Sequence, residues 1–211
     1  MKLRKRLIAS LLALTLVVPL FSAAATKGTV EAAANTITQT SKEVYDDICA
    51  ETNEKYAVLS GNVKVNAALN RYENVQFFVT PEHEKGFSSF QVLWHNDEKG
   101  WYVKVADGTN NLQTEDGVIL DQHQSFNESP LPNITTEVGL DFKIVRLNDW
   151  AYFLVKDTDG GYKLVGRMNG LKDKYTKFSL SNDVIDAEGE QVVLSDYTVT
   201  TGKEEALAAL A

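Results

Sequence analysis

The sequence predicts an all-β protein, an antiparallel β-sandwich with short helices at its two ends. After residue 56, short runs of β-branched and aromatic residues alternate with turn residues at regular spacing. Within several runs, apolar and polar side chains alternate, which indicates strands with one buried and one solvated face. The only cysteine is Cys49, so no intramolecular disulfide can form and the fold must depend on a hydrophobic core.

The first 25 residues have the organisation of a secretory signal peptide. Four basic residues precede an apolar run over 7–21, and small residues end the segment at Ala25. The run is about 15 residues long, whereas a membrane-spanning helix needs about 20. We therefore expect cleavage near Ala25, release from a bacterial-type cell as a secreted, extracellular protein, and no membrane association afterwards.

The charge of the mature chain is strongly acidic. Cleavage removes four of the 21 basic residues and none of the 29 acidic residues, which leaves 17 against 29 and a net charge of −12. Such a chain repels nucleic acid and anionic membranes, so neither is expected as a partner. Acidity also aids the solubility of secreted proteins, and that explanation needs no partner.

The mature chain is long enough for one domain with one core. Residues 26–40 are small and polar, which predicts a flexible leader, and residues 41–211 form the domain. Thr40 and Glu43 fit a capping box that would begin a helix of about ten residues. Thr201 and Glu204 fit a second capping box, before a short terminal helix.

Ten strands are expected between these helices. They cover residues 56–65, 75–80, 87–94, 101–105, 118–120, 142–147, 150–156, 162–166, 178–181 and 191–199. Three connections have the residue types of hairpin turns, namely 96–100, 148–149 and 157–161. One face of each sheet packs and the other meets solvent, as in two stacked antiparallel sheets.

Strand order and character resemble the concanavalin A-like lectin and glucanase superfamily, in its laminin-G-like branch. The resemblance is carried by the strand after Gly100, by the strand pair over 141–154 that contains Arg146, and by the last strand over 194–199. It implies a jelly-roll sandwich over roughly 56–199. It also implies glycan binding, glycan cleavage, protein binding or a spacer role, because members of the superfamily do each of these. The Glu-x-Asp-x-x-Glu string of its glucanases is absent from this sequence.

The candidate carbohydrate-binding residues are aromatic. Trp94, Trp101, Tyr102 and Trp150, together with Tyr152, offer broad apolar faces with a polar edge, which suits stacking on a sugar ring. The same side chains are also natural fillers of a sandwich core. Trp101 is the best surface candidate of the set, because it opens a strand directly after Gly100 at the expected rim.

The sequence contains no recognisable catalytic or metal motif. The three histidines, His83, His95 and His123, have no metal-ligand spacing, and no catalytic residue is assigned. Asp157 and Asp159 begin like a calcium loop, but the third ligand and the closing Glu of such a loop are lacking, and a hairpin turn explains these residues without a metal. Four more aspartates could supply oxygen ligands only if the fold brought their loops together: Asp121, Asp183, Asp186 and Asp196. We expect no cofactor, with calcium as the one open alternative.

Three functions remain compatible with these observations. The first is a secreted, non-enzymatic carbohydrate-recognition module that uses a sheet face or the loop rim. The second is a protein-interaction or structural β-sandwich of an exported assembly, with a cell-surface protein as partner and no small ligand. The third is a glycan-degrading hydrolase, which requires two carboxyl groups facing each other across a cleft. Fold analogy carries most of this choice.

Overall fold

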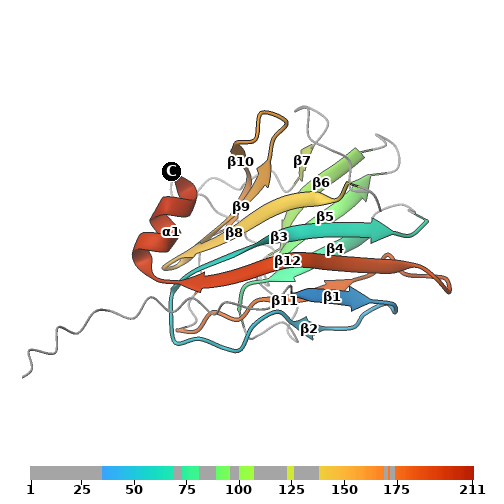
Figure 1. Cartoon of the computed structure of the whole chain (residues 1–211), viewed down its shortest axis with the longest axis horizontal. Coiled ribbons are helices and arrows are strands. Elements are labelled where there is room, and N and C mark those ends of the chain that lie inside the picture. The colour runs from blue at the N-terminus through green and yellow to red at the C-terminus, as the bar shows by residue number, and fades with distance from the viewer. Residues whose placement is uncertain are drawn as a thin grey trace, which may run out of the picture.

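The protein is a sandwich of two six-stranded antiparallel sheets (Figure 1). The computed structural model describes residues 35–68, 73–80, 89–95, 100–106, 123–125, 138–168, 171 and 174–211. The expected signal peptide and residues 26–34 of the leader lie outside these ranges. No helix in the described ranges has both the length and the apolar character needed to cross a membrane.

Each sheet is ordered by antiparallel pairing of its strands. The first sheet runs β1 (Thr36–Gln39), β12 (Gln191–Thr201), β3 (Tyr56–Asn66), β8 (Leu140–Leu147), β9 (Trp150–Lys156) and β10 (Tyr162–Met168). The second runs β2 (Asp46–Asp47), β11 (Ser179–Asn182), β4 (Asn74–Phe78), β5 (Ser89–His95), β6 (Gly100–Ala106) and β7 (His123–Ser125). Strands of the first and last parts of the chain are therefore neighbours within one sheet.

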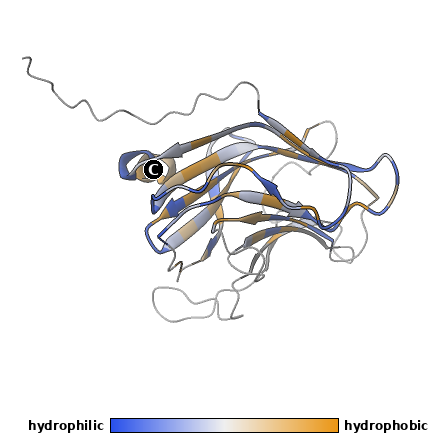
Figure 2. Cartoon of the chain, turned by 90° about the horizontal axis from the view of Figure 1, so that it is seen from below, coloured by the Kyte–Doolittle hydropathy of each residue, from blue (hydrophilic) through white to orange (hydrophobic). Residues whose placement is uncertain are grey.

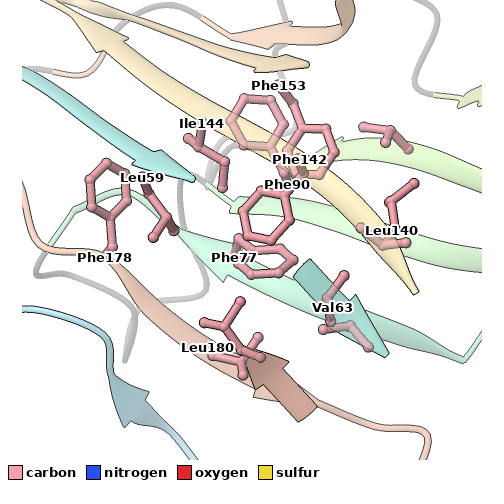
Figure 3. Close-up of a cluster of buried hydrophobic side chains, with 14 of the residues drawn as sticks. Leu59, Val63, Phe77, Phe90, Leu140, Phe142, Ile144, Phe153, Phe178 and Leu180 are labelled. Carbon is pink, nitrogen blue, oxygen red and sulfur yellow. The ribbon is translucent and has the colours of Figure 1, made fainter. Parts of the chain in front are cut away.

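The core lies between the sheets and is rich in phenylalanine. Phe142 and Phe153 of the first sheet stack with ring centroids 5.7 Å apart, and Phe77 and Phe90 of the second sheet approach them to 4.6 and 5.3 Å (Figure 3). Along the strands, hydrophobic and hydrophilic segments follow one another (Figure 2). In β8 the inward residues are fully buried and the outward Lys143 is partly exposed, so the predicted alternation is confirmed.

Most of the predicted strands are confirmed. Nine of the ten runs correspond to observed strands, and the tenth, 118–120, lies outside the described residues. The 148–149 turn joins β8 to β9, with Asn148 at a φ of 57°. The 157–161 turn joins β9 to β10, and Asp157 N donates to the Gly161 carbonyl at 2.7 Å. Three short strands, β1, β2 and β7, are not foreseen by the sequence pattern.

The N-terminal predictions are wrong where the structure describes them. Residues 36–39 of the expected flexible leader form β1, and the expected helix after Thr40 is a turn followed by β2. Glu43 has a φ of 59°, and its N–H donates to the Asn182 carbonyl at 2.9 Å. Ile48 N likewise donates to the Phe178 carbonyl at 2.9 Å. Backbone pairing with the second sheet therefore satisfies groups that a short helix would have paired internally.

The C-terminal helix is confirmed as α1 (Lys203–Leu210), but its predicted capping box is not formed. The N-cap is Gly202, with a φ of 129° and no side-chain cap. The helix lies on the outer face of the first sheet, where Ala206 is buried against Val58 and Val145. The fold thus has one terminal helix in its described part, and that helix covers one end of a sheet face.

Candidate functional site

The candidate site is the outward face of three adjacent strands, β8, β9 and β10. Directly paired residues of antiparallel strands share a face, and the register defines successive rows across the three strands. We call this surface the outer strip. It consists of Asp141, Lys143, Val145, Leu147, Trp150, Tyr152, Leu154, Lys156, Tyr162, Leu164 and Arg167. Val145 and Leu154 are buried in the cluster beneath helix α1, and the other members supply the accessible surface.

Aromatic side chains dominate one end of the outer strip. The rings of Trp150 and Tyr152 stack with centroids 6.1 Å apart and planes 21° from parallel, and both residues are half-buried. The Arg167 guanidinium lies 5.8 Å from the centre of the Trp150 ring. Tyr152 also packs against the cluster beneath helix α1. This contact holds the aromatic pair in place while leaving part of each side chain open to solvent.

A pocket lies at the other end of the outer strip. It encloses about 290 Å³ and is lined by the turn before β8 and by the hairpin between β9 and β10: Val138, Gly139, Asp141, Lys156, Asp157 and Thr158. Asp141 accepts a hydrogen bond from the Asn62 amide at 2.7 Å, and it forms an ion pair with Lys156 at 3.4 Å. Val138 is exposed and gives the pocket an apolar edge. The pocket therefore combines carboxylate, ammonium and apolar groups.

Gly139 shapes this pocket because no other residue fits its position. It has a φ of 69°, where L side chains are strained, and an added Cβ would lie 2.2 Å from Asn62 Oδ1 and 2.6 Å from Lys64 Cγ. Asn62 Oδ1 is itself buried without a hydrogen-bond partner in the structure. A buried acceptor without a partner costs free energy. Gly139 therefore allows the backbone at the edge of the pocket to approach β3 closely.

Tyr162 and Leu164 provide exposed apolar surface along β10, with Tyr162 at the pocket end of the outer strip. They are 37% and 46% exposed. The Lys143 ammonium lies over the Tyr162 ring, 4.0 Å from its centroid. Burial raises the pKa of the Tyr162 phenol, and the nearby Asp141 carboxylate raises this pKa further. The hydroxyl therefore stays protonated at neutral pH and can both donate and accept hydrogen bonds.

Of the predicted aromatic candidates, the structure places Trp150 on the outer strip, together with Tyr152. Trp101 is 2% exposed and belongs to the core, so its choice as the best surface residue is wrong. The reason is periodicity: Trp101 and Val103 alternate onto the inner face of β6, and both are buried. Trp94 lies in β5 and Tyr102 in β6, but their side chains lie outside the described part of the chain.

The charged members of the outer strip were missed by sequence reasoning. Lys143 and Lys156 occupy alternate positions of predicted strands and look like ordinary solvent-facing residues. Arg167 follows the predicted end of its strand, which extends to Met168 in the structure. The register implied by the two hairpin turns could have found them, because it aligns the outward positions of three successive strands on one surface.

The structure assigns most of the considered aspartates to structural roles. Asp157 Oδ1 accepts from the Thr158 N–H, and Asp159 Oδ1 accepts from the Gly161 N–H at 2.8 Å, as in a hairpin turn. Both oxygens of Asp183 accept hydrogen bonds from Asn74, while burial raises the pKa of the Asp183 carboxyl. Asp186 pairs with Lys42.

A metal site can be sought only among the described residues. Within them, no group of three or more His, Cys, Asp or Glu side chains could hold a metal ion. His95 lies in β5 and His123 in β7, whereas His83 and Asp121 lie outside the described ranges. Asp196 stands at the irregularity of β12, with a φ of 52°.

Comparison with known proteins identifies the fold. No family model and no curated protein matches the sequence. Among solved structures, the lumenal domain of VIP36, bound to calcium and Man3GlcNAc, has a TM-score of 0.51 at 8% identity, covering 79% of this chain and 84% of that chain. The lectin UEA-II, complexed with galactose, has a TM-score of 0.50 at 13% identity, covering 80% and 87%.

A third similar structure is a functionally unknown protein from Saccharomyces cerevisiae. It has a TM-score of 0.52 at 8% identity, covering 79% of this chain and 88% of that chain. These likenesses confirm the antiparallel β-sandwich fold that the sequence predicts. At such low identity they establish the fold alone. The function must be argued from the residues on the surface.

Proposed function

We propose that the protein is a secreted, non-enzymatic carbohydrate-recognition module that binds glycans along the outer strip. The observation that carries this proposal is the stacked pair of Trp150 and Tyr152 on a sheet face, with Arg167 beside it. Broad aromatic faces next to charged hydrogen-bonding groups suit the apolar ring faces and the hydroxyls of sugars.

The remaining groups of the outer strip support the same function. The pocket at Asp141 offers a carboxylate that can accept hydrogen bonds from sugar hydroxyls, and Lys156 can donate to them. Tyr162 adds a second exposed ring close to the pocket. The aromatic pair and the pocket lie at opposite ends of β9, about 20 Å apart at the strand rise of about 3.4 Å per residue. A chain of several sugars can contact both.

The test is a glycan-array screen of the mature chain from Thr26 to Ala211, with and without added calcium. Specific binding should be lost in Trp150→Ala, because the platform loses its larger ring. Tyr175→Ala is the matched control, since Tyr175 is 39% exposed but lies outside the outer strip. It should bind like the wild type. Thermal melts of all three proteins exclude loss of fold as the cause.

Other outcomes of the array screen would contradict the proposal or place the binding site elsewhere. No binding on the array under either condition would contradict it. Binding that survives in Trp150→Ala but requires calcium would place the site in another part of the molecule. Equal loss of binding in Trp150→Ala and Tyr175→Ala, at unchanged melting temperatures, would remove the outer strip from consideration, because Tyr175 lies outside it.

A second candidate function, protein interaction, is favoured by the position of β10. Among the strands that the structure describes, β10 is the edge of the first sheet, and its Leu164 is 46% exposed. An open edge can pair with an extended segment of another protein. A clean null on the array, followed by capture of a defined cell-surface partner that Leu164→Lys no longer binds, would support this function instead.

A further inference from the structure

We infer that the ligand of the outer strip is an anionic polysaccharide, one that carries carboxylate groups along its chain. This inference rests on the proposed function and specifies its ligand class. It starts from a contrast in charge. The mature chain has a net charge of −12, yet the outer strip carries three cations, Lys143, Lys156 and Arg167, and one acid, Asp141.

Two of these cations are held without a carboxylate partner. Lys143 lies over the Tyr162 ring and Arg167 over the Trp150 ring. Within the described part of the chain, neither forms an ion pair with an acidic side chain, whereas Lys42, Lys55, Lys156 and Lys177 all do. Each ring orients its cation but does not neutralise it. Both charges therefore remain available to a ligand.

The placement of the two cations favours a polymer over a small anion. Lys143 leans toward Tyr162, which pairs with Lys156 at the pocket end of the strip, and Arg167 leans toward Trp150 at the opposite end. Trp150 and Tyr162 lie toward opposite ends of the strip, because Lys156, the partner of Tyr162, is six residues from Trp150 along β9. With one cation leaning toward each ring, carboxylates on separate sugars of one chain can each contact a cation.

The apolar groups between the cations favour a carbohydrate over other polyanions. Leu164 is exposed, and Trp150 and Tyr152 are partly open to solvent. Sugar rings have apolar faces that cover such surface, while their carboxylates reach the neighbouring ammonium and guanidinium groups. The acidic remainder of the chain repels polyanions from other faces and confines them to the outer strip.

The test compares polymers that differ in charge or in backbone chemistry, and polygalacturonate and its methyl ester differ in charge alone. Binding of the mature chain is measured to polygalacturonate, alginate and hyaluronate, to fully methyl-esterified polygalacturonate, and to polyglutamate. We expect one of the three acidic glycans to bind at least about tenfold more tightly than the neutral ester or polyglutamate. Raising the salt concentration should weaken this binding, because the charged contacts lie at the surface.

Charge variants then locate the binding surface. Lys143→Gln and Arg167→Gln should each weaken binding about fivefold, as expected for one exposed charged contact. Lys174→Gln is the matched control, because Lys174 is exposed and lies outside the outer strip, and it should leave affinity unchanged. Equal melting temperatures would show that the losses do not come from unfolding.

The outcomes separate this inference from the proposed function. Equal binding of the acidic polymer and its methyl ester, lost in Trp150→Ala, would overturn the charge inference and leave glycan recognition intact. Binding of neutral glycans only would likewise overturn the charge inference and leave glycan recognition intact. Equal binding of polyglutamate would overturn the choice of a carbohydrate. Binding to none of the acidic polymers, with no hit on the glycan array, would overturn both.

Discussion

At the scale of single residues, the feature of the fold that most needs hydrogen-bond partners is a buried arginine. Arg146 lies on the inner face of β8 and is fully buried. Its guanidinium donates to the Asn148 carbonyl at 3.2 Å, to the Tyr175 carbonyl, and to Thr176 Oγ1 at 3.2 Å. Thr176 Oγ1 in turn donates to the Glu54 carbonyl. A planar guanidinium with five donors can satisfy several such acceptors at once.

We predict that Arg146→Met lowers the free energy of unfolding by about 3 kcal/mol, because buried acceptors lose their charged donor. Arg146→Lys should lose about 2 kcal/mol, since a compact ammonium cannot reach all of the acceptors. Urea denaturation measures both. Lys174→Met, an exposed neighbour of the Tyr175 contact, should stay within about 0.5 kcal/mol. An Arg146→Met protein as stable as this control would show that the network does not stabilise the fold.

At the scale of elements, helix α1 is held to the first sheet by one small residue. Ala206 is fully buried against Val58 and Val145, and Leu210 packs beside them. The small side chain allows close approach of the helix to β3 and β8. The helix has no side-chain cap, so its stability must come from this packing rather than from its eight residues alone.

We predict that Ala206→Arg destabilises the protein by about 3 kcal/mol, because a long cation cannot be accommodated in that contact. Ala208→Arg, on the exposed side of the same helix, should change stability by less than about 0.5 kcal/mol. Urea denaturation followed by circular dichroism distinguishes the two variants. Equal stability would mean that α1 does not depend on Ala206 for docking.

Element by element, the sequence predicted the fold where strands were long enough to show periodicity. The β8–β9 hairpin was foreseen because seven or eight residues reveal alternation and Asn148 supplies a turn residue tolerant of positive φ. Strands β1 and β2 have only four and two residues, too few to display a period of two. Gln39 also made β1 harder to predict, because it is a polar residue at a buried position.

The candidate site could be predicted only in part, for a similar reason. Trp150 was selected because its broad apolar face suits a sugar ring, and the structure places it on the outer strip. The same reasoning selected Trp101, which turned out to be buried. A sequence shows that two residues share a face, but which face meets the core depends on the second sheet. Arg146 illustrates the point, because alternation places it inward and its charge argues against that.

At the scale of the whole molecule, β1 joins the two sheets at one edge of the sandwich. It pairs with β12 in the first sheet, from Thr36 opposite Ser195 to Gln39 opposite Val192. The Gln39 amide donates to the Leu180 carbonyl of the second sheet at 3.1 Å. Asn182 returns a hydrogen bond to Gln39 Oε1 at 2.8 Å. Segments from opposite ends of the chain are thus connected by a buried amide network.

We therefore predict that the start of the folded chain is sharply defined. A protein that begins at Asn35 should unfold at the same urea concentration as one that begins at Thr26, because the residues removed precede β1. A protein that begins at Thr40 should lose about 3 kcal/mol, since Asn182 and the Leu180 carbonyl lose buried partners and Ile37 no longer covers the core.

The proposed glycan binding should survive that truncation at temperatures below the melting temperature. The outer strip lies on β8 to β10, whereas β1 is at the opposite edge of the same sheet. Changes at two distant sites have additive effects on the free energy of unfolding, and neither change alters the contacts of the other site. Retained affinity in the Thr40 protein, together with lower stability, would show that β1 acts on the fold and not on recognition. Equal stability of all three chains would mean that the buried amide network contributes nothing to the closure of the sandwich.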